Sequence, residues 1–509
     1  MNLARRLSLV AGARPEKTAV RFEDTVYTYG DLDSEIARHA SMLHGFGVSP
    51  GDRVGIQLPK CMEFVFLELA VLSVGGIVLP LNSDYKQEEV HYFLADSGSR
   101  FLFTDAQRFD RFRGLAQQLP ELVTVVMGDR EQEETSSLTA LLAGADEAYT
   151  RTYPTGDDDV AMIIYTSGTT GRSKGALLSH ANLVANMDAL HVTWEWSDRD
   201  VLLHALPLFH VHGLFVALHG ALNAGARVVM HEKFDPARIW DTIGKGECTI
   251  LMGVPTMYQR LVNQWEAMER TPSLASMRLF ISGSAPLLES QFNRFEKETG
   301  SRILERYGMT EAGMIASNPI DSAGRIAGSV GFPLPGVSIR VVDPDGADKP
   351  PGEVGEVWIR GDNVFQGYWG MPEKTAESFH EGWFKTGDLG YLDAQERGRL
   401  FLVGRAKELI ITGGYNVYPK EIEDVLESHG SVTEAAVVGL PDEDFGERVI
   451  AVVCLGGREA ASAEQLIGYC RERLAGYKCP KQVFVVDALP RNAMGKLQKN
   501  VLVKQFAGK

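Results

Sequence analysis

The sequence YTSGTTGRSKG, residues 165–175, directly follows the apolar residues VAMII of positions 160–164. β-Branched and aromatic residues make up most of the run from Val160 to Tyr165, which predicts a buried strand. The strand is followed by glycines, hydroxyl residues and two cations, Arg172 and Lys174. Glycines let backbone N–H groups approach an anion closely, while hydroxyls and cations add donors and positive charge. The stretch therefore predicts a phosphate-binding loop after a buried strand.

This loop differs from a Walker A loop, whose Gly-Lys-Ser/Thr end opens a helix. Here Lys174 is followed by Gly175 and an apolar Ala-Leu-Leu, and Ser179 is the next residue suited to cap a helix. We therefore expect the helix to begin after Ser179. A plain surface loop rich in Gly, Ser and Thr is the alternative, and the flanking strand and the two cations argue against it.

Length and composition set the class of protein. A chain of 509 residues is too long for one ordinary core, so we expect two or more domains. With 44% hydrophobic, 23% charged and 9% aromatic residues, the composition is that of a globular protein. A net charge of −16 argues against general binding to nucleic acid or to an anionic membrane. Any polyanion must therefore be held locally.

The cysteines, the N-terminal residues and the length of the apolar runs indicate where in the cell the protein is expected. The five cysteines are scattered and form no CxxC pair, so neither a disulfide framework nor a zinc site is expected. A reducing compartment, the cytoplasm, fits best. Residues 1–20 predict an amphipathic first helix, with an organelle-targeting segment as the alternative. No apolar run approaches the roughly 20 residues of a membrane span, so no integral membrane segment is expected.

Helices and strands alternate through the first part of the chain. The expected helices span residues 27–41, 62–74 and 88–97, and the expected strands span 52–58, 77–81 and 100–104. This alternation predicts an α/β fold with doubly wound parallel sheets and helices on both faces. Residues 128–158, rich in Asp, Glu, Gly and Thr, are interpreted as a solvated connection.

The composition changes in the last third of the chain. Residues 328–401 contain short β runs separated by Pro and Gly turns, which predicts a small antiparallel β portion. A domain boundary is expected near residues 404–407. Beyond it the segments 421–426, 435–439, 449–455, 463–474 and 482–486 predict a compact α+β unit of normal domain size. We therefore expect a large N-terminal domain, 1–404, and a smaller, mobile C-terminal domain, 405–509.

Four further motifs follow the phosphate loop in order: YGMTE at 307–311, TGD at 386–388, GRAKE at 404–408 and PRNAMGK at 490–496. Together with the loop, this set resembles the adenylate-forming superfamily of acyl-CoA synthetases, luciferases and peptide-synthetase adenylation domains. The resemblance covers almost the whole chain. It implies that ATP and Mg²⁺ activate a carboxylic acid as an acyl-adenylate, which CoA then converts into a thioester.

The resemblance also implies a nucleotide site. The glycine-rich loop would hold the β- and γ-phosphates, Thr310 the α-phosphate and Glu311 the Mg²⁺ ion. Adenine would lie between Tyr307 and the backbone of residues 283–285, and Asp388 would accept hydrogen bonds from the ribose hydroxyls beside Arg405. The nucleotide-binding residues expected on this basis are Thr166, Ser167, Gly168, Thr169, Thr170, Lys174, Gly283, Ser284, Ala285, Tyr307, Asp388 and Arg405.

The catalytic step is assigned by the resemblance to Lys496, together with Thr310 and Glu311. The family counterpart of Lys496 reaches the carboxylate and the α-phosphate as the adenylate forms, where a mobile ammonium stabilises the developing charge. Relatives then rotate the C-terminal domain about a hinge, which Lys407 matches. After rotation, the loop containing Gly413 and Gly414 would line the channel for the pantetheine arm of CoA.

The acid pocket is expected near residues 207–213 and 252–260, and these stretches look most like malonyl-CoA synthetases. A buried second carboxylate requires a cation, for which Arg260 is the candidate, with a surface ion pair as the alternative role. The other residues expected in the pocket are His210, Val211 and Met309. Val211 stands where malonyl-CoA synthetases have Thr; the lost hydroxyl removes a hydrogen bond of about 1 kcal/mol. The more apolar pocket would also suit methylmalonate or a monocarboxylic chain.

Three readings of function remain open at this point. The leading one is an AMP-forming synthetase of malonyl- or methylmalonyl-CoA. The rivals are a medium- or long-chain fatty acyl-CoA synthetase and an adenylating domain that loads a carrier protein or acts as a luciferase-like oxygenase. A non-catalytic nucleotide sensor is disfavoured by Lys496, Glu311 and Thr310. The sequence does not distinguish a monomer from a homodimer.

Overall fold

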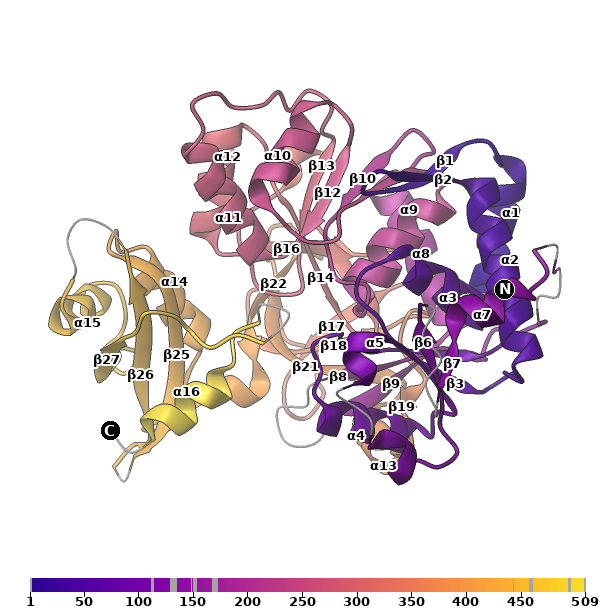
Figure 1. The fold of residues 1–509 in the computed structure, drawn as a ribbon. Helices are drawn as coiled ribbons and strands as arrows, with labels where there is room; N and C mark the ends of the chain where they lie inside the picture. Colours follow the sequence, from indigo (N-terminus) through magenta and orange to yellow (C-terminus); the bar gives the residue numbers. More distant parts are fainter. Residues whose placement is uncertain are drawn as a thin grey trace.

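Three β-sheets and the helices packed on them account for the chain in this computed structural model (Figure 1). The description covers residues 2–110, 114–128, 135–147, 149, 153–166, 173–396, 398–442, 444–456, 461–492 and 496–507, without the side chains of 116 and 117. All statements about the structure refer to these residues. Two of the sheets belong to the part of the chain before residue 406 and the third to the part after it.

An eight-stranded sheet carries the predicted phosphate strand. Its order is β19-β9-β8-β4-β3-β5-β6-β7, and every pair from β8 to β7 is parallel. The predicted strand is β8, and an unpredicted strand, β9, returns antiparallel to it with Lys174 opposite Thr166. The strands are β3 Arg53–Gln57, β4 Ile77–Pro80, β5 Phe101–Asp105, β6 Val123–Met127, β7 Thr135–Ser137, β8 Val160–Thr166, β9 Lys174–Ser179 and β19 Gly367–Tyr368.

One expectation for this region was wrong. The stretch 128–158, interpreted as a solvated connection, contains β7 and the short helix α7, Leu138–Ala143. The strand pairs in parallel with β6, and Leu138 is buried in the main core. The polar composition misled the interpretation because an edge strand needs apolar contacts on only a few of its residues.

A 14-stranded sheet forms the second layer. Strands β1, β11, β10, β12, β13 and β14 are parallel neighbours, and the sheet continues through β15, β16, β22, β21, β18 and β17 in antiparallel pairs. The predicted antiparallel portion is therefore hydrogen-bonded to the parallel strands. The strands are β1 Thr18–Phe22, β2 Thr25–Thr28, β10 Val201–His204, β11 Arg227–Met230, β12 Ile250–Gly253, β13 Leu279–Ser282, β14 Leu304–Met309, β15 Gly313–Ser317, β16 Ser329–Pro333, β17 Ser338–Val342, β18 Gly355–Arg360, β20 Phe379–His380, β21 Trp383–Leu392 and β22 Leu400–Arg405.

Helix starts follow the capping rules. Thr28 and Asp31 form a capping box at α2, and Ser179 and Asn182 form one at α8, where the sequence predicted the helix to begin. Helix α3 is buried along nearly its whole length. It belongs to the main hydrophobic core, which also contains residues of both sheets. Besides α7, the helices of this part are α1 Leu3–Ala13, α2 Tyr29–Gly45, α3 Met62–Ser73, α4 Gln87–Ser97, α5 Ala106–Phe109, α6 Leu115–Gln118, α8 His180–Thr193, η1 His212–His219, α9 Gly220–Asn223, α10 Pro236–Gly244, α11 Pro255–Glu266, α12 Glu289–Thr299, η2 Ser322–Gly324 and α13 Pro372–Glu377.

The last hundred residues form a separate lobe, drawn in gold and yellow in Figure 1. Its five-stranded sheet has hydrophobic clusters of its own, built from residues 410–506. The predicted boundary between 404 and 405 falls at the last residue of β22 and stays a prediction. The elements are η3 Ala406–Glu408, β23 Ile410–Thr412, β24 Tyr415–Val417, α14 Pro419–Glu427, β25 Val432–Asp442, β26 Gly446–Leu455, α15 Ala463–Arg471, β27 Gln482–Val485 and α16 Lys499–Phe506. The α/β fold class with a smaller α+β domain is thus confirmed.

The cysteines are inaccessible or nearly so. Cys248, Cys454, Cys470 and Cys479 are buried and Cys61 is half-buried; none forms a disulfide. Burial raises the pKa of Cys61 and of Cys248 to about 12. Among the described residues, no helix combines the length and the apolar character that crossing a bilayer requires.

Candidate active site

Three strands of the large sheet bring together the groups expected around the ribose and adenine. The Tyr307 hydroxyl of β14 donates to Asp388 Oδ2 at 2.5 Å, and Arg405 Nε lies 2.8 Å from Asp388 Oδ1. Asp388 and Arg405 are directly paired residues of β21 and β22. A carboxylate has about four acceptor positions, so Asp388 can still accept from a diol. This cluster therefore joins three of the predicted nucleotide residues by direct contacts.

Burial dominates the electrostatics of this cluster. It raises the pKa of Asp388, against the opposing effects of Arg405, Tyr307 and Lys496. The pKa of Tyr307 is also raised, by burial and by the Asp388 carboxylate. The tyrosine hydroxyl therefore keeps its proton and remains a donor at neutral pH.

A second cluster lies where the phosphates are expected. Glu311 is buried and accepts a hydrogen bond of 3.0 Å from the Tyr368 hydroxyl. The Lys174 ammonium lies 4.0 Å from the centre of the Tyr368 ring. Burial lowers the pKa of Lys174, and Glu311 opposes that effect. Thr310 is half-buried in the turn before β15.

The predicted phosphate loop between β8 and β9 is described only at its two ends. Thr166 Oγ1 donates to the carbonyl oxygen of Lys174 at 3.4 Å, which closes the base of the loop. Tyr92 donates to the carbonyl oxygen of Ser173 at 2.7 Å. The predicted phosphate residues Ser167, Gly168, Thr169 and Thr170 lie outside the described residues.

Glu311 is the predicted protein ligand of Mg²⁺ in this cluster. In polyphosphate sites this ion is commonly held by one or two carboxylates together with phosphate oxygens and water. No group of three or more His, Cys, Asp or Glu suited to a metal occurs in the described part of the chain. A single buried carboxylate beside the base of the phosphate loop therefore fits Mg²⁺ bound together with a nucleotide, and does not fit a metal held by protein groups alone.

Lys496 reaches this region from the C-terminal lobe. Its backbone N–H donates to Asn492 Oδ1 at 3.0 Å, and Asn492 N–H donates back to the Lys496 carbonyl at 2.9 Å. Desolvation and the Arg405 guanidinium lower the pKa of Lys496, although part of the residue stays exposed. The carboxylates of Asp388, Glu408 and Glu311 oppose that effect. Two of these carboxylates belong to the nucleotide clusters, so Lys496 lies near enough for their charges to act on it, and its catalytic role stays a prediction.

The predicted hinge and CoA loop follow β22. Lys407 lies in the single 3₁₀ turn η3, and burial and Arg405 lower its pKa to about 8. Gly413 and Gly414 form the turn between β23 and β24 with φ of 56° and 80°, values that favour glycine. The neighbouring Tyr415 is 59% exposed. The roles of these residues stay predictions.

The residues expected around the acid are placed in three different environments. Val211 is buried and His210 and Met309 are half-buried, whereas Arg260 is exposed on α11. Burial lowers the pKa of His210 to about 3, so its imidazole is neutral. An exposed Arg260 gains little from an ion pair, because solvent screens it.

Arg306 is a buried cation that the sequence analysis missed. It is 3% exposed, and burial lowers its pKa to about 9. Its Nη2 donates to Ser284 Oγ at 3.4 Å, and its Nε is buried without a partner among the described atoms. A Cβ on Gly283 would lie 2.3 Å from the guanidinium carbon, so the glycine makes room for it. The available signal was a pair of adjacent charges inside the buried strand LERY.

Polar groups connect Arg306 to a second basic side chain, the half-buried Lys60. Ser284 adopts a positive φ of 70° and its Oγ is hydrogen-bonded to His212 Nδ1 at 3.1 Å. The carbonyl of the next residue, Gly213, accepts from His204 Nε2 at 2.8 Å, and Lys60 Nζ donates to His204 Nδ1 at 2.7 Å. The segment begins a π-helix, η1, a conformation found frequently at functional sites.

Burial shifts this network toward its neutral forms. It lowers the pKa of Lys60 and, with the effect of Lys60 added, that of His204. It also lowers the pKa of His212, and the nearby Arg306 adds to that shift. Lys60, His204 and His212 are therefore held closer to their neutral forms, and Arg306 is the cation of this network.

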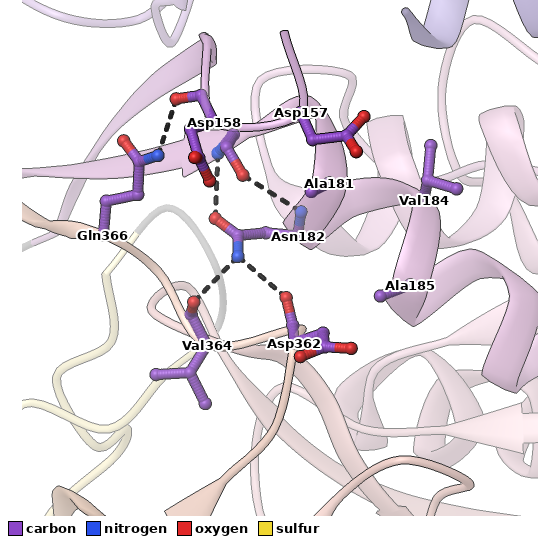
Figure 2. A pocket seen from close by; sticks show the side chains of 10 residues that line it. Asp157, Asp158, Ala181, Asn182, Val184, Ala185, Asp362, Val364 and Gln366 are labelled. Carbon is purple, nitrogen blue, oxygen red and sulfur yellow. Dashed lines mark hydrogen bonds between the residues drawn. The ribbon is translucent and has the colours of Figure 1, made fainter. Parts of the chain in front are cut away.

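A cavity of about 420 Å³ lies elsewhere, at the N-terminal end of α8 (Figure 2). Asn182 donates to the carbonyl oxygens of Asp362 and Val364, each at 2.8 Å, and Gln366 Nε2 donates to the Asp158 carbonyl at 2.6 Å. None of its lining residues belongs to the predicted site. The cavity thus lies where residues 157–158, 179–185 and 362–366 meet, and it contains none of the predicted catalytic or binding residues.

Comparison with known proteins supplies the family. The model of the AMP-binding enzyme family matches residues 7–369, and that of the AMP-binding enzyme C-terminal domain matches residues 421–496. Feruloyl-CoA synthase from Amycolatopsis sp is 36% identical over 97% of this chain and 96% of the relative. Malonate–CoA ligase from Arabidopsis thaliana is 34% identical, over 96% and 86%.

A solved structure covers the full length. The crystal structure of ATP-bound MatB from Rhodopseudomonas palustris superposes with a TM-score of 0.92 at 43% identity, covering 100% of this chain and 99% of the other. The resemblance stated from the motifs is thus confirmed. The chain belongs to the AMP-binding enzyme family, as an acid–thiol ligase of the AMP-forming acyl-CoA ligase superfamily, whose members use ATP, Mg²⁺ and CoA.

Proposed function

We propose that this ligase activates a small dicarboxylic acid, malonate or methylmalonate, and transfers it to CoA. In the first step a carboxylate oxygen of the acid attacks the α-phosphorus of ATP, and pyrophosphate leaves. In the second step the CoA thiolate attacks the carbonyl carbon of the adenylate, and AMP leaves. The observation that carries the dicarboxylate assignment is the buried, incompletely partnered Arg306.

A buried guanidinium is costly unless an anion accompanies it. Within the described residues Arg306 forms no salt bridge, although the charge of the adjacent Glu305 acts on it, and its Nε has no acceptor. The adjacent Glu305 instead directs Oε1 to the Leu287 N–H at 3.1 Å. A substrate carboxylate would complete the site, because a guanidinium binds a carboxylate through two parallel hydrogen bonds.

Position links Arg306 to the reacting centre. It precedes Tyr307 in β14, and Tyr307 contacts Asp388 in the predicted nucleotide site. Successive side chains of a strand alternate between faces, so Arg306 and Tyr307 leave β14 on opposite sides. Arg306 nevertheless contacts Ser284, another predicted nucleotide residue, which supports an acid with one carboxylate at the α-phosphate and a second on Arg306. Arg260 stays the second candidate for the cation.

The remaining residues would act as follows. Lys174, Thr310 and the glycine-rich loop would hold the phosphates, Glu311 would ligate Mg²⁺, and Asp388 would bind the ribose. Mg²⁺ would supply charge neutralisation on the phosphate oxygens. The Lys496 ammonium would stabilise the negative charge that develops on the oxygens between the acid and the α-phosphate, during the first step only. The C-terminal domain would then turn about Lys407 and bring the loop of Gly413 and Gly414 to the thiol.

The apolar side chain of Val211 supports binding of methylmalonate as well as malonate. Val211 is buried where the resemblance expects a hydroxyl, so this position between His210 and His212 is apolar. An extra methyl group buried there contributes roughly 0.8 kcal/mol. We therefore expect methylmalonate to be used at a rate comparable to that of malonate.

The experiment is a panel of acids assayed for pyrophosphate release, with acyl-CoA identified by mass spectrometry. Malonate and methylmalonate are expected to give kcat/KM values at least tenfold above those of octanoate and ferulate. A higher kcat/KM for octanoate or ferulate would overturn the dicarboxylate assignment. Adenylate that accumulates without acyl-CoA would favour a carrier-loading enzyme instead.

A further inference from the structure

Lys499 is a half-buried cation just past the predicted catalytic lysine, and the motif roles leave it unassigned. It is the first residue of α16, and its side chain is 14% exposed. Its Nζ lies 2.7 Å from Glu423 Oε1 and 3.4 Å from Glu408 Oε2. Burial alone would lower its pKa, but Glu423 and Glu408 outweigh burial and raise it. Lys499 is therefore charged and ion-paired on two sides.

The two carboxylates belong to two different segments of the C-terminal lobe. Glu408 lies in η3, the turn that contains the predicted hinge residue Lys407. Glu423 lies in the middle of α14, and its Oε1 also accepts from the Val437 N–H of β25 at 2.8 Å. Lys499 thus connects the hinge turn directly to α14 and, through Glu423, to the edge strand β25 of the C-terminal lobe.

Lys499 also directly follows residues 490–498, the segment that contains Lys496. Gln498, the last residue of that segment, donates its N–H to the Pro490 carbonyl at 2.8 Å, and Arg491 pairs with Leu497 in a β-bridge. The base of the Lys496 segment is therefore closed by backbone bonds and held to the hinge turn by the Lys499 ion pairs.

We propose that Lys499 is a positioning residue for adenylation: its ion pairs with Glu408 and Glu423 hold Lys496 at a fixed reach from the hinge turn. It does not touch the reacting atoms. Its loss leaves two carboxylates unneutralised and lets the Lys496 segment shift relative to Glu408. A displacement of about 1 Å in a catalytic group can cost about a hundredfold in rate.

The inference rests on the two-step reaction of the proposed function and is independent of which acid is used. Lys496 acts in the first step only, so loss of its positioning should slow adenylation and spare thioester formation. A general loss of stability would slow both steps. The ratio of the two half-reactions therefore separates positioning from a merely structural role.

The test measures both half-reactions in the full-length protein, with the acid that the parent uses best in the panel. Adenylation is followed by ATP–pyrophosphate exchange without CoA, and thioester formation by adding CoA to the synthetic adenylate of that acid. Lys499→Met is expected to lower exchange about 10- to 100-fold and to change thioester formation less than threefold. Lys499→Arg, which keeps the charge, is expected to retain at least a third of the exchange rate.

Three controls keep the proposal open to refutation. Lys504→Met removes an exposed lysine of the same helix and should leave both half-reactions unchanged. Glu408→Gln removes one of the two ion pairs and should lower exchange by a smaller factor than Lys499→Met. The double variant Lys496→Ala/Lys499→Met should be no slower in exchange than Lys496→Ala, because Lys499 acts through Lys496. Equal loss in both half-reactions, or an additive double variant, would overturn the proposal.

Discussion

Replacement of Arg306 by Met tests the dicarboxylate assignment most directly. Methionine keeps much of the volume and removes the charge from a side chain that is 3% exposed. In the protein without substrate the guanidinium is held at a pKa of about 9, which is a shift of several units at about 1.4 kcal/mol each. Its removal relieves that cost, so the melting temperature should stay level or rise.

With malonate bound, Arg306→Met is expected to be unfavourable instead of neutral or favourable. The second carboxylate of malonate would be left buried without a partner, and breaking a buried ion pair in this way costs about 3–5 kcal/mol. At 1.4 kcal/mol per factor of ten, kcat/KM for malonate should fall roughly a hundredfold to several thousandfold. Octanoate has no second carboxylate, so its kcat/KM should not fall and should approach or exceed that of malonate.

The assay is pyrophosphate release at varied malonate, with Arg260→Met as the matched control. Arg260 is exposed on α11, where a screened ion pair is worth at most about 1 kcal/mol, so its removal should lower kcat/KM less than about fivefold. The reasoning fails if Arg306→Met keeps malonate turnover within fivefold of the parent. It also fails if Arg260→Met causes the larger loss, which would return the assignment to Arg260.

Two further predictions concern neighbouring groups. Tyr307→Phe removes the hydroxyl that donates to Asp388, so KM for ATP should rise about tenfold with KM for malonate unchanged; a rise in both would refute a nucleotide-specific role. Burial raises the pKa of Glu305 to about 7, so the folded protein keeps a proton that the unfolded chain loses above about pH 4.3, and this destabilises the fold progressively between about pH 4.3 and 7. Glu305→Gln cannot ionise, and its melting temperature relative to the parent should therefore increase from pH 5 to pH 8; a constant difference would contradict the raised pKa.

The parts of the fold that sequence predicts are those set by local chemistry. Strand β8 follows from its β-branched run, and α8 follows from the cap that Ser179 provides. Strand β9 was missed because KGALLS is short and has no strict alternation; it is a strand because β8 offers a free edge beside it. The continuity of the antiparallel strands with the parallel sheet depends on pairing partners far apart in the chain, which composition does not encode.

The candidate site divides along the same line. Asp388, Arg405 and Tyr307 were predicted because each lies in a motif, and the structure brings the three into contact. Arg306 lies inside one of those motifs, but its importance comes from burial and a missing acceptor, which are properties of the folded chain. The three-way contact of Lys499 likewise joins residues up to 91 positions apart. Such contacts leave no spacing pattern in the sequence.

The buried cysteines give the protein a practical advantage for spectroscopy. Thiols with pKa values near 12, such as Cys61 and Cys248, react slowly with maleimides at neutral pH, because the thiolate is the nucleophile. Cysteines introduced by Lys504→Cys on α16 and Val192→Cys at the end of α8 would lie on exposed positions in the two lobes. A donor and acceptor dye attached there would report the separation of the lobes during turnover, without prior removal of the native thiols.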